Sequence, residues 1–213
     1  MSKSMRTAAS LTVACLLAAS VAAQGNAPPF GVATGPAMPV GSYHSANGGE
    51  GFNSAWQLMA LVAFKPAAIP LGVRIDVSYG SHAGNDQLNG DLTSALGQPA
   101  REQAKLLGGN VDLTYPATSV ARLQPYVLGG IGVYHTTITV TVGDSTPSDA
   151  ATKLAWNFGG GISYGGAGRP FAVFLEVRYI SVGAVSGFPR RRPFAVFLEV
   201  RYISVGAVSG FPR

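Results

Sequence analysis

The chain has 213 residues, of which 12% are charged and 47% hydrophobic, with 28 glycines and one cysteine. Soluble globular domains average about 25% charged residues, so the composition argues against an ordinary water-exposed surface. The formal charge of +5 does not indicate a nucleic-acid partner. Two positive charges lie in the first 23 residues, and four arginines against one glutamate lie in residues 191–213; without these segments the formal charge is zero.

The amino terminus has the pattern of a secretory signal peptide. Lys3 and Arg6 precede an apolar stretch over residues 7–20, and Val21-Ala22-Ala23 fits the small-residue cleavage rule. We therefore expect residues 1–23 to be removed. The only cysteine lies in this segment, so disulfides play no part in the expected mature chain. No later stretch approaches the eighteen or so apolar residues of a helical membrane span.

Apolar residues alternate with small or polar ones along most of the mature chain, which is the period of a half-exposed β-strand. A first strand at 30–40 contains two prolines, which cannot donate to a ladder. The alternation then predicts strands at 55–65, 71–79, 102–115, 125–143, 153–164 and 171–181. The two strands at 125–143 and 153–164 exceed the usual length of a strand in soluble domains.

The bulky residues of each strand share one parity. In a soluble sheet this face would pack into a core, whereas a membrane barrel turns it toward lipid and keeps the polar face in the lumen. We predict the second arrangement. The expected lipid-facing aromatic residues are Trp56, Phe64, Tyr79, Tyr115, Trp156, Phe158, Tyr164 and Tyr179.

The connections between the predicted strands alternate in length. Long or intermediate polar segments at 42–54, 80–101 and 143–152 are separated by short ones at 66–70, 116–124 and 165–170. Outer-membrane barrels have long outer loops and tight periplasmic turns. Soluble up-and-down barrels can show the same alternation, so this pattern supports a membrane barrel without deciding for it.

Five charged residues fall on the polar parity of their strands, where they would face the lumen. They are Arg74, Asp76, Asp112, Glu176 and Arg178. Charges in a narrow lumen of low dielectric constant must be paired and hydrogen-bonded. A structural network that fills a closed barrel is the simpler interpretation, because eight strands leave just enough room for side chains. An ion gate or a catalytic carboxylate set are the functional alternatives.

The chain ends in a verbatim repeat. Residues 169–190 read RPFAVFLEVRYISVGAVSGFPR, and residues 192–213 repeat them with Arg191 between. The repeat indicates a recent in-frame duplication or an error in the gene model, since repeats under selection diverge. The first copy supplies a seventh strand, and residues 194–204 are the only candidate for an eighth. An even strand number would then close the barrel.

The leader, PYVLGGIGVY, WNFGGGISYG and the FLEVRY strand together resemble the small outer-membrane β-barrel proteins, the opacity-protein-like and OmpX-like barrels. The resemblance covers residues 24–183 and implies eight strands and roles in adhesion, envelope integrity or host interaction through the outer loops. Most members of that family lack enzymatic activity. Such barrels usually end in an aromatic residue that the outer-membrane assembly machinery reads. This chain ends in Ser-Gly-Phe-Pro-Arg instead.

The sequence contains no recognisable motif for catalysis, metal binding or cofactor binding. His44 and His82 lie in predicted outer loops and His135 in the fifth strand, without metal-ligand spacing. Ser45, Ser81 and Asp86 could join them at an outer rim, but no motif places a nucleophile beside a base. The glycine clusters at 129–132 and 159–161 lie inside strands, so we interpret them as sites of close packing or bending.

The sequence thus predicts an all-β, antiparallel, up-and-down transmembrane barrel of eight strands in the outer membrane: a leader at 1–23, a barrel at 24–190 and a duplicate at 191–213. The expected function is structural, adhesive or surface-interacting, with no catalysis, no cofactor and no metal. Expected partners are outer-membrane lipid, the assembly machinery and an extracellular ligand or surface. A narrow passive pore or small-ligand binder, and a soluble periplasmic carrier of apolar ligands, are the alternatives.

Overall fold

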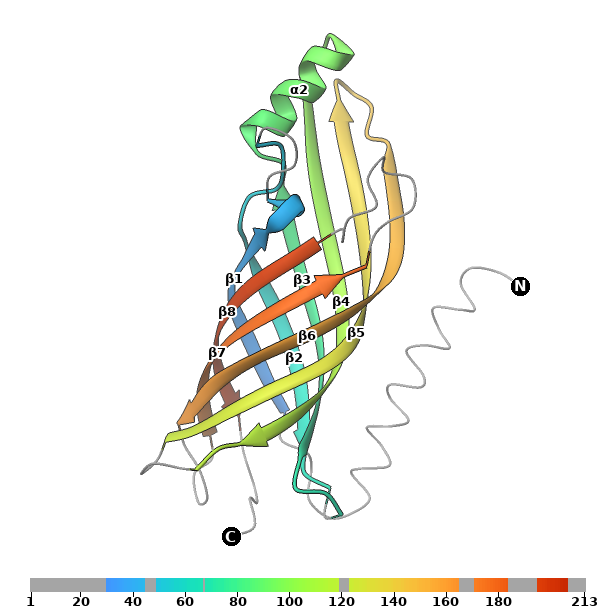
Figure 1. Cartoon of the computed structure of the whole chain (residues 1–213). Helices are drawn as coiled ribbons and strands as arrows, with labels where there is room; N and C mark the ends of the chain where they lie inside the picture. Colours follow the sequence, from blue (N-terminus) through green and yellow to red (C-terminus); the bar gives the residue numbers. More distant parts are fainter. Residues whose placement is uncertain are drawn as a thin grey trace, which may run out of the picture.

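Antiparallel strands close into one barrel in the computed structural model, which describes residues 30–44, 49–66, 68–118, 123–164, 171–183 and 195–206 (Figure 1). Each strand pairs with its neighbours in sequence, and the last strand returns to pair with the first. The strands are β1 (Phe30–Val40), β2 (Ala55–Phe64), β3 (Gly72–Ala83), β4 (Ala100–Pro116), β5 (Leu123–Val142), β6 (Ser148–Tyr164), β7 (Phe171–Val182) and β8 (Ala195–Gly206).

The predicted fold class is confirmed, with an up-and-down order from β1 to β8. The expected leader at 1–23 lies outside the described residues. Both prolines of β1 are accommodated within the strand, where Pro36 lies opposite Trp56 of β2. The second copy of the repeat supplies β8, whose backbone pairs with β7 on one side and β1 on the other.

The connection predicted at 80–101 is wrong in its bounds and its content. Strand β3 continues to Ala83, β4 begins at Ala100, and between them lies a helix, α2 (Asp86–Leu96). The Asn85 side chain caps the helix by accepting a hydrogen bond from the Leu88 backbone N–H at 2.9 Å. Gly97 ends it in the left-handed conformation, with φ of 67°. The segment is mostly polar, so its composition predicts a loop rather than the helix that these caps delimit.

Strands β4, β5 and β6 rise beyond the rim formed by the other strands, and α2 lies at the same end of the barrel (Figure 1). The connection predicted at 143–152 is shorter than expected, because β6 begins at Ser148. A short 3-10 helix, η1 (Gly41–Tyr43), follows β1 at this end. Phe52 then bridges to Gly84, which ties the β1–β2 connection to the start of the α2 segment.

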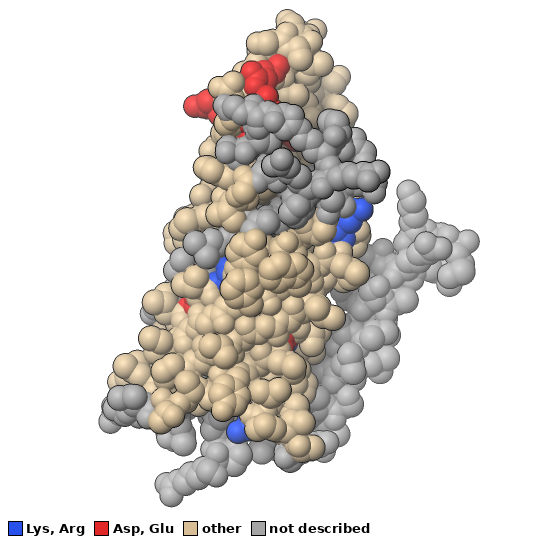
Figure 2. All heavy atoms as spheres, viewed as in Figure 1, with Lys and Arg blue, Asp and Glu red and all other residues tan. Residues whose placement is uncertain are grey.

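The outer surface of the wall is apolar and the inner surface is mixed. Trp56, Ile131 and Leu154 are each at least 70% exposed, as no soluble core would leave them. One sequence neighbour of each, Gln57, Gly132 or Ala155, is buried in the interior. Figure 2 shows the result on one face: few charged side chains on the lower wall, and acidic ones gathered at the end that carries α2.

Candidate functional site

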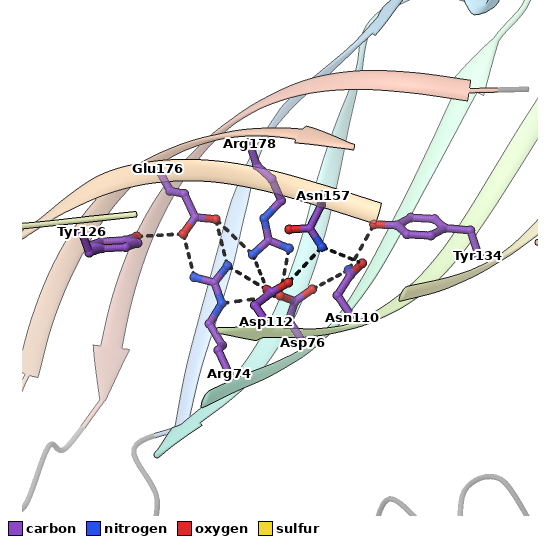
Figure 3. A network of polar contacts seen from close by, with 9 residues as sticks. All are labelled: Arg74, Asp76, Asn110, Asp112, Tyr126, Tyr134, Asn157, Glu176 and Arg178. Atoms are coloured by element: carbon purple, nitrogen blue, oxygen red, sulfur yellow. Dashed lines mark hydrogen bonds and ion pairs between the residues drawn. The ribbon is translucent and has the colours of Figure 1, made fainter. Parts of the chain in front are cut away.

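The five charged residues predicted for the lumen lie together inside the barrel (Figure 3). They come from β3, β4 and β7 and are at most 4% exposed: Arg74, Asp76, Asp112, Glu176 and Arg178. The alternation of the strands aims them inward, and curvature of the closed sheet then brings β3 and β7 across from each other. Residues 102 positions apart in sequence thereby come into contact.

The two guanidinium groups each contact all three carboxylates. Arg74 pairs with Glu176 at 2.6 Å, with Asp112 at 3.3 Å and with Asp76 at 3.6 Å. Arg178 pairs with Asp112 at 2.9 Å, with Asp76 at 3.1 Å and with Glu176 at 3.3 Å. Because arginine presents its donors in a planar fork, each one can hold two carboxylates apart and neutralise them together.

Four further residues of the network were missed from the sequence. Asn110 donates to Asp76 at 2.9 Å and to the Tyr134 hydroxyl at 3.1 Å. Asn157 donates to Asp112 at 2.9 Å, and the Tyr126 hydroxyl donates to Glu176 at 2.8 Å. Asn110 and Asn157 could have been predicted, because they lie on the polar parity of their strands. No feature of the sequence indicates that Tyr126 and Tyr134 face the network.

Apolar clusters pack on both sides of this network. Toward α2, Tyr134 belongs to a buried cluster made of Ala37, Tyr43, Phe52, Ala104, Leu106, Tyr134, Ala155, Ile180 and Val182. On the other side, Tyr126 packs against a cluster made of Ala33, Met59, Leu61 and Phe174. The charged network is therefore enclosed between two apolar layers rather than open to a water-filled channel.

The apolar cluster toward α2 includes a stacked aromatic pair. The rings of Tyr43 and Phe52 lie 4.6 Å apart, and His82 contacts Tyr43 edge-on at 6.1 Å. Burial raises the pKa of the Tyr43 hydroxyl above its ordinary value, and the nearby Glu102 charge adds to this shift. Both effects disfavour a tyrosinate, so this cluster stays neutral at physiological pH.

The histidines do not form the outer rim that the sequence allowed. His82 was expected in a solvated loop, but it lies in β3, is fully buried, and its Nδ1 lies 3.0 Å from the Asn53 carbonyl oxygen. His44 is exposed after η1, while His135 faces outward on β5 and contacts Thr152 at 2.9 Å. Within the described ranges, no group of His, Cys, Asp and Glu side chains is arranged to hold a metal ion.

The residues weighed for an active site are separated as well. Ser81 and His82 are consecutive in β3, so they face opposite sides of the wall. Asp86 is exposed in the first turn of α2, and Ser45 lies outside the described residues. Among these residues, the ones that the structure describes, Ser81, His82 and Asp86, do not bring a nucleophile and a base together.

The eight predicted lipid-facing aromatics all share the outward parity of their strands. Trp156, Phe158 and Tyr179 form one outer cluster, with ring centroids 5.2–5.8 Å apart. The exposed ones are Trp56, Tyr79, Tyr115, Trp156, Phe158 and Tyr164, whereas Phe64 and Tyr179 are half-buried.

Adjacent glycines in β5 allow a test of how tightly the network is packed. A Cβ at Gly130 would overlap the Val111 carbonyl and the Asp112 carboxylate, whereas a Cβ at the outward-facing Gly129 would lie 3.6 Å from the nearest atom. We expect Gly130→Ala to lower the free energy of unfolding by about 1–3 kcal/mol through overpacking. Gly129→Ala should leave it unchanged or raise it by up to about 1 kcal/mol. Urea unfolding in detergent micelles measures both; equal effects would contradict the tight packing.

No helix in the described part of the chain is long and apolar enough to cross a membrane. The family model for the outer membrane protein beta-barrel domain matches residues 11–189. A major outer membrane protein from Thermus thermophilus has a similar fold, with a TM-score of 0.60 and 13% identity over 85% of this chain and 100% of the other. Neisserial surface protein A gives 0.51 and 15% identity over 84% and 97%. No curated protein sequence matches.

Proposed function

Because the chain belongs to the outer membrane protein beta-barrel domain family and is located in the outer membrane, we propose that it acts as a closed barrel that presents a surface outside the cell and catalyses no reaction. The longer connections in such barrels face the exterior. The end that carries α2 and the extensions of β4, β5 and β6 is then extracellular. The other end faces the periplasm.

The observation that carries this proposal is the filled lumen. An open pore needs a continuous column of water, yet the inward-facing charges pair with one another at 2.6–3.6 Å and apolar clusters flank them on both sides. This arrangement supports a structural barrel over the narrow passive pore. In such a barrel the network stabilises the fold and the extracellular end makes the contacts.

A soluble carrier of apolar ligands is the alternative that the structure overturns. Such a carrier would turn its bulky residues inward to line a ligand cavity, whereas Trp56, Leu154 and Ile131 face outward and are at least 70% exposed. The interior instead holds charged side chains and small apolar clusters. The family match agrees with this correction.

Planar-bilayer recording tests whether the barrel is closed. The full chain, refolded into detergent and added to a bilayer, is expected to give no stable conductance steps. Its insertion should be checked in parallel by co-flotation with vesicles, so that silence is not mistaken for failed insertion. Regular conductance steps from the inserted chain would show a pore and overturn the closed-barrel proposal.

The same proposal assigns the extracellular end a contact role. Helix α2 has no buried residue, and Leu96 is 49% exposed at its end, so this segment is available to an outside ligand or surface. Outer-membrane lipid around the wall and the assembly machinery during insertion complete the expected partners. Replacing residues 86–96 with a Gly/Ser linker should abolish the adhesion of cells that express the chain to an external surface. Barrel assembly should remain intact.

A further inference from the structure

The outer faces of β4 and β5 change character at one level of the barrel. Below it the outward side chains are apolar, ending with Leu107 and Val133. Above it the same faces continue with polar side chains only, which we call the upper face: Arg101, Gln103, Lys105, Thr137, Thr139 and Thr141. The register pairs Lys105 with Thr137 and Arg101 with Thr141, so the upper face is one continuous sheet surface.

The upper face continues onto the neighbouring strands at the same level. Lys105 lies opposite Ser81 of β3, and His135, opposite Leu107, is bonded to Thr152 of β6. The row through Leu107 and His135 therefore marks where the apolar wall ends. Side chains directly above this row lie at the depth of the lipid headgroups when the apolar wall lies in the hydrocarbon.

The charge on the upper face is of one sign. Arg101 and Lys105 are exposed, and no carboxylate among the described residues points from this face. Glu102 shares the inward parity of Ala100 and Ala104, and Asp149 lies opposite the inward-facing Ile138. The other acidic side chains of this end lie at Glu50 in the β1–β2 connection, on α2 or in the 143–147 turn, and none of them is an outward-facing position of β4 or β5.

We propose that the upper face binds phosphate groups of lipid headgroups in the outer leaflet. Lys105 sits directly above the apolar wall, and Arg101 lies four residues farther along the strand, about 13 Å away at 3.3 Å per residue. The threonine hydroxyls between them can donate to phosphate or sugar oxygens. The inference rests on the extracellular orientation of the α2 end but not on whether the lumen is closed.

The test uses the full chain reconstituted in phosphatidylcholine vesicles with and without phosphatidylglycerol. The readout is the number of phosphatidylglycerol molecules retained per barrel, by native mass spectrometry. Each cation near an anionic surface contributes about fivefold in affinity. The double variant Arg101→Gln/Lys105→Gln should therefore lower the apparent affinity for the anionic lipid by about 25-fold.

The matched control is Lys65→Gln, which removes one exposed cation at the opposite end; the double variant should lower the apparent affinity at least about fivefold more than this control does. Because these side chains are exposed, each variant is expected to fold. The heat-dependent shift in gel mobility checks this. Inorganic phosphate alone should not compete at equal phosphate concentration. If the double variant retains as much anionic lipid as the wild type, or if free phosphate competes fully, the proposal is overturned.

A separate experiment shows whether the α2 end faces the periplasm instead of the exterior. In that case the cations still meet headgroups, but a single cysteine placed at Thr141 would not react with a membrane-impermeant maleimide on intact cells. The expected mature chain has no cysteine of its own, so the label reports this position alone. Labelling of intact cells supports the outer-leaflet assignment, and labelling only after lysis contradicts it.

Discussion

A chain that stops after Arg190 is expected to lose the compact form that barrels keep in unboiled gel samples. The deletion removes β8, which pairs with β7 from Phe171↔Gly206 to Val182↔Ala195 and with β1 from Val32↔Ser204 to Val40↔Val196. Two strand edges would then face lipid with unpaired backbone groups, each of which costs several kcal/mol. The expected result is a complete loss of the heat-dependent mobility shift in the outer-membrane fraction.

The matched control is a chain that stops after Gly206, which keeps all of β8 and should retain the shift. The register explains why a verbatim copy can close the barrel: antiparallel pairing about Val177 and Val200 sets Glu176 opposite Arg201 and Arg178 opposite Glu199. If the chain ending at Arg190 still shifts, β7 pairs directly with β1 and the second copy is dispensable.

Replacing Arg178 with methionine is expected to have the second large effect. The side chain is fully buried and contacts three carboxylates at 2.9–3.3 Å, so its removal takes a guanidinium partner from Asp76, Asp112 and Glu176 at once. Breaking a buried ion-pair network from one side costs about 3–5 kcal/mol. Urea unfolding in detergent micelles, followed by the fluorescence of Trp56 and Trp156, should show a loss of this size.

Two further variants separate charge from packing. Arg178→Met/Glu176→Gln restores the original balance of charge and should recover part of the loss. Arg178→Lys keeps the charge but not the planar fork, and we expect an intermediate stability. A double variant no more stable than Arg178→Met would mean that lost packing of the long side chain, rather than unpaired carboxylates, causes the effect.

The repeat and the glycines show how much the sequence could say about packing. The duplication predicts an eighth strand at 194–204, and the structure places β8 at Ala195–Gly206. The glycines of β5 and β6 are predicted points of close approach, and Gly130 and Gly159 indeed face backbone atoms that leave no room for a Cβ. Both inferences use the local sequence pattern alone. For the glycines, the reason is that a glycine inside a strand often marks a site where another segment of backbone approaches closely.

Local pattern does not predict structure that depends on contacts between residues far apart in sequence. The segment of helix α2 predicts a loop because it is polar with an internal glycine, whereas the helix is stabilised by the Asn85 cap and by Leu88 packing on the interior. The polar neighbours of His82 predict a solvated side chain. Its burial depends instead on Tyr43, whose ring packs against it, and on the segment of the β1–β2 connection whose Asn53 carbonyl meets its Nδ1.

The sequence by itself determined which side chains share a face, because a strand turns successive residues to opposite sides and this period needs no partner. It therefore placed Arg74 and Arg178 with the carboxylates on the inner face. Only the tertiary structure decided which charges meet, because that depends on the closure and shear of the sheet, which bring β7 across to β3 and recruit Tyr126 and Tyr134. The local period is encoded residue by residue, whereas the contacts across the lumen exist only once the barrel has closed.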